Sequence, residues 1–125
     1  MFIAAFSGMT SICRSPIGKI LSDPLTKSTY EKCLREAISI AKAKKVRIAE
    51  DSFESIMTIS NNTAPDSKSS LLVDIENNRR NEIETLNGAL VRYTHECEID
   101  IPINQLIYGA IKLQSQKDDF TIPSI

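Results

Sequence analysis

The sequence predicts an all-α domain of about six helices. Apolar residues recur three or four positions apart along most of the chain, which is the spacing of one helix face. The connections between these runs are short, and no segment alternates convincingly between apolar and polar residues as a strand would. The length of 125 residues, with 42% hydrophobic and 25% charged residues, fits one soluble globular domain with a single core.

The first half of the chain contains the most regular helical patterns. A helix without a capping residue is expected over 2–13, and the Ser-Pro pair that follows ends it, before a short helical turn at 16–23. Asp23 and Pro24 are a capping residue and a first-turn proline, and they predict the longest helix, from Leu25 to about Val46.

The middle of the chain predicts a shorter helix followed by a loop. Within 50–60, Phe53, Ile56 and Met57 stand at helical spacing behind acidic and hydroxyl residues. Residues 61–70 (NNTAPDSKSS) are rich in turn formers and predict a loop.

The segment 69–88 (SSLLVDIENNRRNEIETLNG) combines helical spacing with a polar corner. Asn81 and Glu84 have the form of a capping box, which predicts a helix from about Glu82 to residue 98. Gly88 then lies inside a helix at a cost of about 1 kcal/mol relative to alanine. Either a close approach by another backbone or a ligand requires this glycine, or the cost is simply tolerated.

The chain ends with one more expected helix, which begins at Pro102, and a frayed tail over 117–125. Its 15 basic and 16 acidic residues give a net charge of −1, so charge does not favour nucleic acid or an anionic membrane as partner. Three widely spaced cysteines and a single histidine indicate a reduced, cytoplasmic protein without a metal site.

Hydroxyl and acidic residues at the expected helix starts are the candidates for binding. Ser69 and Ser70 either cap a helix or bind an anion such as a carboxylate. Glu82 either complements a helix dipole or faces a ligand. The residues alone leave both interpretations open.

The same stretch resembles the signature of the C-terminal domain of ketopantoate reductases (2-dehydropantoate 2-reductases). In that family a Ser-Ser-Met-Leu-x-Asp helix leads to Arg-x-Thr-Glu-Ile-Asp and then to Asn-Gly. The matching residues here are Ser69, Ser70, Leu71, Leu72, Asp74, Arg79, Glu82, Ile83, Glu84, Asn87 and Gly88. Upstream, Thr10, Ser11, Pro16 and Gly18 match a Thr to Pro-x-Gly element, and downstream Ile99, Pro102 and Asn104 match the closing segment.

The resemblance implies a helical bundle like the C-terminal domain of 6-phosphogluconate dehydrogenase-type reductases. In the family, this domain closes over NADPH and a 2-oxo acid held by an N-terminal Rossmann domain. The sequence contains no G-x-G-x-x-G, so residues 1–125 are expected to be the single helical domain, with the Rossmann domain absent from this chain.

The resemblance also assigns roles to individual residues. Ser70 and Ser7 take the positions of substrate-binding residues, and Glu82 takes that of a glutamate on the cofactor side of the cleft. The family's catalytic lysine would precede Met1, so the fragment alone is expected to be inactive. The expected partners are a 2-oxo acid, the chain's own Rossmann domain and a second copy in a homodimer. The implied reaction is the reduction of ketopantoate to pantoate in pantothenate biosynthesis.

Four departures from the family pattern keep alternatives open. Ile3 and Ser7 replace two substrate-binding asparagines, Asn81 stands where threonine is usual, and Leu71 replaces methionine. An isoleucine cannot hydrogen-bond the substrate, which admits a related 2-oxo acid. The other alternative is a non-catalytic helical module for dimerisation or regulation.

Overall fold

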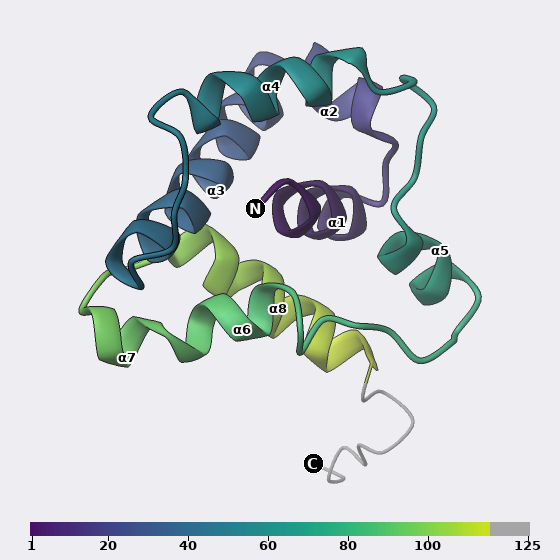
Figure 1. Cartoon of the computed structure of the whole chain (residues 1–125). Coiled ribbons are helices and arrows are strands. Elements are labelled where there is room, and N and C mark those ends of the chain that lie inside the picture. The colour runs from purple at the N-terminus through teal and green to yellow at the C-terminus, as the bar shows by residue number, and fades with distance from the viewer. Residues whose placement is uncertain (116–125) are drawn as a thin grey trace, which may run out of the picture.

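A computed structural model of the chain describes residues 1–115, and these residues form helices and connecting turns without any strand (Figure 1). The expected tail at 117–125 lies outside the described residues. The helices are α1 (Phe2–Cys13), α2 (Ile17–Ser22), α3 (Pro24–Ala43), α4 (Ser52–Asn62), α5 (Ser70–Glu76), α6 (Asn87–Arg92), α7 (Thr94–Cys97) and α8 (Pro102–Ser115). The all-α prediction is confirmed.

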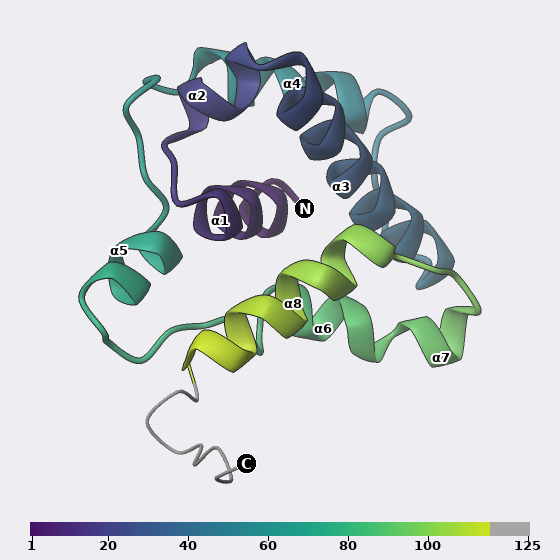
Figure 2. The same cartoon turned by 180° about the vertical axis from the view of Figure 1, so that it is seen from behind.

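Helix α1 lies at the centre of the domain, surrounded by the other helices in both views (Figures 1 and 2). It contacts α2, α3, α4, α5 and α8. Small side chains allow this close packing, and a Cβ atom on Gly8 would lie only 2.9 Å from Asn87 Nδ2. Because it is buried on most sides, α1 is apolar almost all round, as a core helix should be.

Helix α3 begins as the sequence predicts. The Asp23 carboxylate accepts hydrogen bonds from the amides of Leu25 and Thr26, and Pro24 occupies the first helical position. Tyr30, Cys33 and Leu34 from this helix are fully buried in the core. The helix ends at Ala43, three residues earlier than expected.

Helix α8 is joined to the core by buried polar side chains. The Asn104 amide nitrogen donates to the Glu36 carboxylate at 2.9 Å and to the Cys33 carbonyl at 3.2 Å. Its side-chain oxygen accepts from Asn87 Nδ2 at 2.8 Å. The Glu36 carboxylate also accepts from the backbone amides of Ile103 and Asn104, so a residue of α3 caps the start of α8.

The predicted helix from Glu82 to residue 98 is wrong in its start and in its continuity. The helix begins at Asn87, and a break at Tyr93 divides it into α6 and α7. Asn81 accepts a hydrogen bond from the amide of Ile83, and Glu84 does not return to close a capping box. Residues 83–86 form turns instead.

Burial of Asn87 explains why the capping box does not form. The Asn87 side chain is fully buried and donates to Asn104 at 2.8 Å and to the carbonyl of Ala4 at 3.3 Å. Gly88 follows, and an added Cβ would lie 2.9 Å from the Tyr108 ring and 3.0 Å from the carbonyl oxygen of Ile83. The close approach expected at Gly88 is therefore made by α8 and by the preceding turn. These tertiary contacts outweigh the local capping preference.

No helix of residues 1–115 is long and apolar enough to cross a membrane.

Candidate functional site

A groove of about 520 Å³ lies between the start of α5 and the turns that precede α6. Its walls are formed by Ser70, Leu71, Asp74, Arg80, Asn81, Glu82, Glu84, Thr85 and Leu86. Ser70 and Glu82, which are twelve residues apart in sequence, therefore lie in one groove. We call it the Ser70–Glu82 groove.

The two serines at the start of α5 have different roles. Ser69 is buried and caps the helix, since its hydroxyl accepts from the amide of Leu72 at 3.1 Å. The same hydroxyl shares a 2.7 Å hydrogen bond with Thr10, whose own proton goes to the carbonyl of Phe6. Ser70 is exposed, and its hydroxyl has no hydrogen-bond partner within residues 1–115. Ser69 thus caps the helix, and its neighbour Ser70 is the candidate for contact with a ligand.

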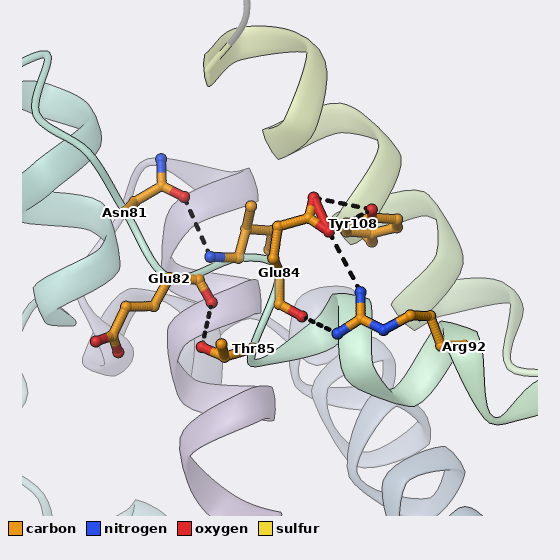
Figure 3. Close-up of polar contacts among 7 residues, drawn as sticks. Asn81, Glu82, Glu84, Thr85, Arg92 and Tyr108 are labelled. Carbon is orange, nitrogen blue, oxygen red and sulfur yellow. Dashed lines mark hydrogen bonds and ion pairs between the residues drawn. The ribbon is translucent and has the colours of Figure 1, made fainter.

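Glu82 and Glu84 also differ, although only one residue separates them (Figure 3). The Glu84 carboxylate accepts hydrogen bonds from the Tyr108 hydroxyl at 2.8 and 2.9 Å and pairs with Arg92 at 3.3 Å. The Glu82 side chain points the other way and is exposed, and its carboxylate has no partner in the described part of the chain. Its backbone carbonyl accepts from the Thr85 hydroxyl at 3.0 Å. Glu84 is occupied in holding the fold, whereas Glu82 is available to a ligand.

The third predicted site residue, Ser7, lies apart from this groove. It is buried on α1, with only 3% of its surface exposed, and it does not line the Ser70–Glu82 groove. Ile3, one turn earlier on the same helix, is 59% exposed. The first turn of α1, rather than its middle, therefore presents side chains to the surface.

Ile3 lines a second, mostly apolar groove of about 380 Å³. Its lining residues are Met1, Ile3, Ala4, Ala37, Ile40, Ala41, Lys44, Val46, Thr85, Leu86, Ala89, Leu90 and Tyr93. Thr85 and Leu86 also line the Ser70–Glu82 groove, so the two grooves adjoin at this turn. The sequence interpretation missed this apolar groove, because its residues come from three separate segments.

The cysteines do not supply a nucleophile to these grooves. Burial, with a smaller contribution from the nearby Glu36 carboxylate, raises the pKa of the Cys33 thiol to about 12. Burial also raises the pKa of Cys13. Within residues 1–115, no group of three histidine, cysteine or acidic side chains is placed to hold a metal ion.

Comparisons with known proteins place this arrangement in a family. Residues 1–115 match the family model described as the ketopantoate reductase PanE/ApbA C-terminal domain. A 2-dehydropantoate 2-reductase of Pyrobaculum aerophilum is 27% identical over 109 residues, which cover 87% of this chain and 39% of the relative. The chain thus spans about two fifths of the length of this relative.

Solved structures show the same fold. The ketopantoate reductase of Ralstonia eutropha superposes with a TM-score of 0.85 at 24% identity, over 95% of this chain and 40% of that one. A ketopantoate reductase of Staphylococcus aureus superposes with a TM-score of 0.84 at 21% identity, over 94% of this chain and 42% of that one. Because the family model matches all of the residues that the structure describes, this protein belongs to the ketopantoate reductase C-terminal domain family.

Proposed function

We propose that this chain is the substrate-closing domain of an NADPH-dependent reductase that converts 2-dehydropantoate (ketopantoate) to pantoate. The observation that carries the proposal is the Ser70–Glu82 groove, which brings one available hydroxyl and one available carboxylate together in a domain of this family. The rest of the active site comes from a Rossmann domain that these 125 residues do not include.

The groove residues fit the two ligands of such a reaction. Ser70 can donate a hydrogen bond to the carboxylate of a 2-oxo acid. The exposed Glu82 carboxylate can accept hydrogen bonds from the ribose hydroxyls of a nicotinamide cofactor. When bound, NADPH supplies the hydride for the carbonyl carbon. The proton for the carbonyl oxygen comes from the lysine that the resemblance places before Met1, so the groove binds and orients without transferring the proton.

Substitutions in the groove test these roles in a protein that joins this chain to the Rossmann domain of the Pyrobaculum aerophilum relative. We expect Ser70→Ala and Glu82→Gln each to lower kcat/KM about ten- to hundredfold, the value of one hydrogen bond to a charged group. Ser70→Ala should raise KM for the 2-oxo acid, and Glu82→Gln should raise KM for NADPH. Steady-state kinetics with each ligand varied in turn measures both effects.

Two exposed residues outside the grooves provide matched controls for this test. Ser28→Ala and Glu54→Gln make the same chemical changes on α3 and α4. They should leave kcat/KM and the KM values for the 2-oxo acid and for NADPH unchanged. If the groove variants behave like these controls, the assignments of Ser70 and Glu82 fail. The chain would then fit better as a non-catalytic module of dimerisation or regulation.

Ile3 favours a related substrate as the second candidate. It is 59% exposed in the apolar groove, at a position where the resemblance places a substrate-binding asparagine. An apolar side chain there provides no partner for the hydroxyl group of ketopantoate. A 2-oxo acid with a purely apolar side chain matches this surface better.

Replacing Ile3 by asparagine should shift substrate preference toward ketopantoate. In the joined protein, we expect Ile3→Asn to raise kcat/KM for ketopantoate relative to 2-oxo-3-methylbutanoate by about tenfold, because it restores one hydrogen bond to the hydroxyl. The ratio of the two kcat/KM values is the measurement. Leu25→Asn, on an exposed leucine of α3 outside both grooves, should leave the ratio unchanged. A ratio that stays constant in both variants would remove Ile3 from the substrate site.

The apolar groove and α8 are the surfaces that we assign to partners. The groove includes Met1 at the start of α1, so the Rossmann domain is proposed to cover it. Leu106 and Leu113 lie seven residues apart on α8 and are 65% and 71% exposed. The Staphylococcus aureus relative is described as dimeric, and we assign this face of α8 to a homodimer.

A further inference from the structure

A third groove lies on the other side of the corner formed by residues 77–81. It has a volume of about 660 Å³, within the range of small-molecule sites. Four of its lining residues are basic, namely Arg14, Arg79, Arg80 and Lys112, and two are acidic, Glu76 and Glu84. We call it the basic groove.

Both acidic residues of the basic groove are paired with cations that do not line it. Glu76 pairs with Lys68 at 3.2 Å. Glu84 pairs with Arg92 at 3.3 Å and accepts from the Tyr108 hydroxyl. The negative charge that lines the groove is therefore compensated from outside, and it does not neutralise the four basic side chains.

Two of the four basic side chains have neutral partners. Arg14 donates to the side-chain oxygen of Gln114 at 2.6 Å, and the Lys112 ammonium lies 5.5 Å from the centre of the Tyr108 ring. Neither contact removes positive charge from the groove.

The other two basic side chains come from the corner itself. Arg79 approaches Asp74 at 3.9 Å, a loose ion pair with 61% of the arginine side chain exposed. Arg80 makes no ion pair with any residue of 1–115. The basic groove thus carries an excess of positive charge.

The backbone brings these cations together from three separate elements. Arg14 ends α1 in the left-handed conformation, with φ at 52°, where the chain turns sharply. Asn78 adopts φ of 57° at the corner that carries Arg79 and Arg80. Lys112 comes from the last turn of α8. Gathering like charges in this way costs Coulomb energy, and a bound anion would relieve that cost.

We propose that the basic groove binds a small anion that carries two or more phosphate or carboxylate groups. Guanidinium groups match both of these groups, since each can donate two parallel hydrogen bonds to a pair of oxygens. Arg80, Asn81 and Glu84 line this groove and the Ser70–Glu82 groove as well, so the two sites share a wall.

Titration of the 125-residue chain with inorganic pyrophosphate and with citrate, in roughly 0.15 M salt, tests the proposal. NMR spectra should show saturable shifts centred on the amides of Asn78, Arg79 and Arg80. Binding of one probe alone would identify the anion class, and binding of both would indicate that charge and geometry suffice.

The double variant Arg80→Gln and Lys112→Gln should weaken binding at least about tenfold, because two charge-assisted contacts are lost. The matched control is Lys42→Gln with Arg47→Gln, which removes the same charge from exposed residues in the last turn of α3 and in the segment that follows it. The affinity of the control variant for each anion should stay within about twofold of that of the unsubstituted chain. The proposal fails if neither probe binds, or if the two double variants lose affinity equally.

Discussion

Replacing Asn104 by leucine should remove a large part of the stability of the domain. The side chain is fully buried, and three groups lose a partner when it is replaced: the Asn87 amide, the Glu36 carboxylate and the carbonyl of Cys33. Each of these lost hydrogen bonds contributes about 0.5 to 1.5 kcal/mol, and the one to the charged Glu36 carboxylate about 1.5 to 3 kcal/mol. We expect the free energy of unfolding to fall by about 3 to 5 kcal/mol, against a typical total of about 5 to 15.

Urea unfolding followed by circular dichroism measures this effect. Gln105→Leu is the control, since it makes nearly the same change on the next, exposed residue of α8. It should alter the free energy of unfolding by less than about 0.5 kcal/mol. An Asn104→Leu protein that unfolds at the same urea concentration as the control would show that the buried amide network does not hold α8 in place.

Replacing Gly18 by alanine should produce the second large effect. An added Cβ would lie 2.6 Å from both the Cβ and the carbonyl oxygen of Pro65. The carbonyl also accepts from the Gly18 amide at 2.8 Å, so the two backbones cannot separate without losing that hydrogen bond. We expect a loss of about 2 to 3 kcal/mol in the free energy of unfolding.

Gly109 provides the opposite case in the same chain. Nothing lies within 4 Å of a Cβ added there, in the interior of α8. Gly109→Ala should therefore increase the free energy of unfolding by up to about 1 kcal/mol, as for an unhindered glycine in a helix. Thermal unfolding of both variants checks the pair. Effects of opposite sign are expected, and a destabilised Gly109→Ala beside an unaffected Gly18→Ala would contradict the packing described here.

Local signals predicted the first half of the fold well. Asp23 and Pro24 form a cap whose contacts lie within three residues, so a sequence pattern can identify it. The apolar spacing at the start of the chain likewise identified α1. What spacing could not show is that α1 is the central helix, because that depends on contacts with at least five other helices.

The start of the helix after Glu82 could not be predicted from sequence, because distant contacts rather than local ones determine it. The capping pattern of Asn81 and Glu84 is local, but Asn87 is held by Ala4 and Asn104, which are 83 and 17 residues away in sequence. The start of α6 is therefore set by the burial of the Asn87 side-chain amide against residues that are distant in sequence. The Asn-Gly pair was informative as a sign of close packing, not of a hairpin.

The candidate site was predicted in part. The resemblance selected Ser70 and Glu82, and the structure places both in one groove. The sequence could not show that Ser69 caps α5 and that the Ser70 hydroxyl stays available to a ligand. These separate roles depend on the contact between Ser69 and Thr10, which are far apart in sequence. Their roles in binding remain the proposal that the kinetic tests address.

The most direct test of the central claim compares three preparations: this chain alone, the Rossmann domain of the Pyrobaculum aerophilum relative alone, and the two joined. NADPH consumption in the presence of ketopantoate or 2-oxo-3-methylbutanoate is the measurement. We expect turnover only in the joined protein, because each half lacks groups that the reaction needs. A joined protein that folds and binds NADPH but reduces neither 2-oxo acid would contradict the claim that this chain is the closing half of a 2-oxo acid reductase.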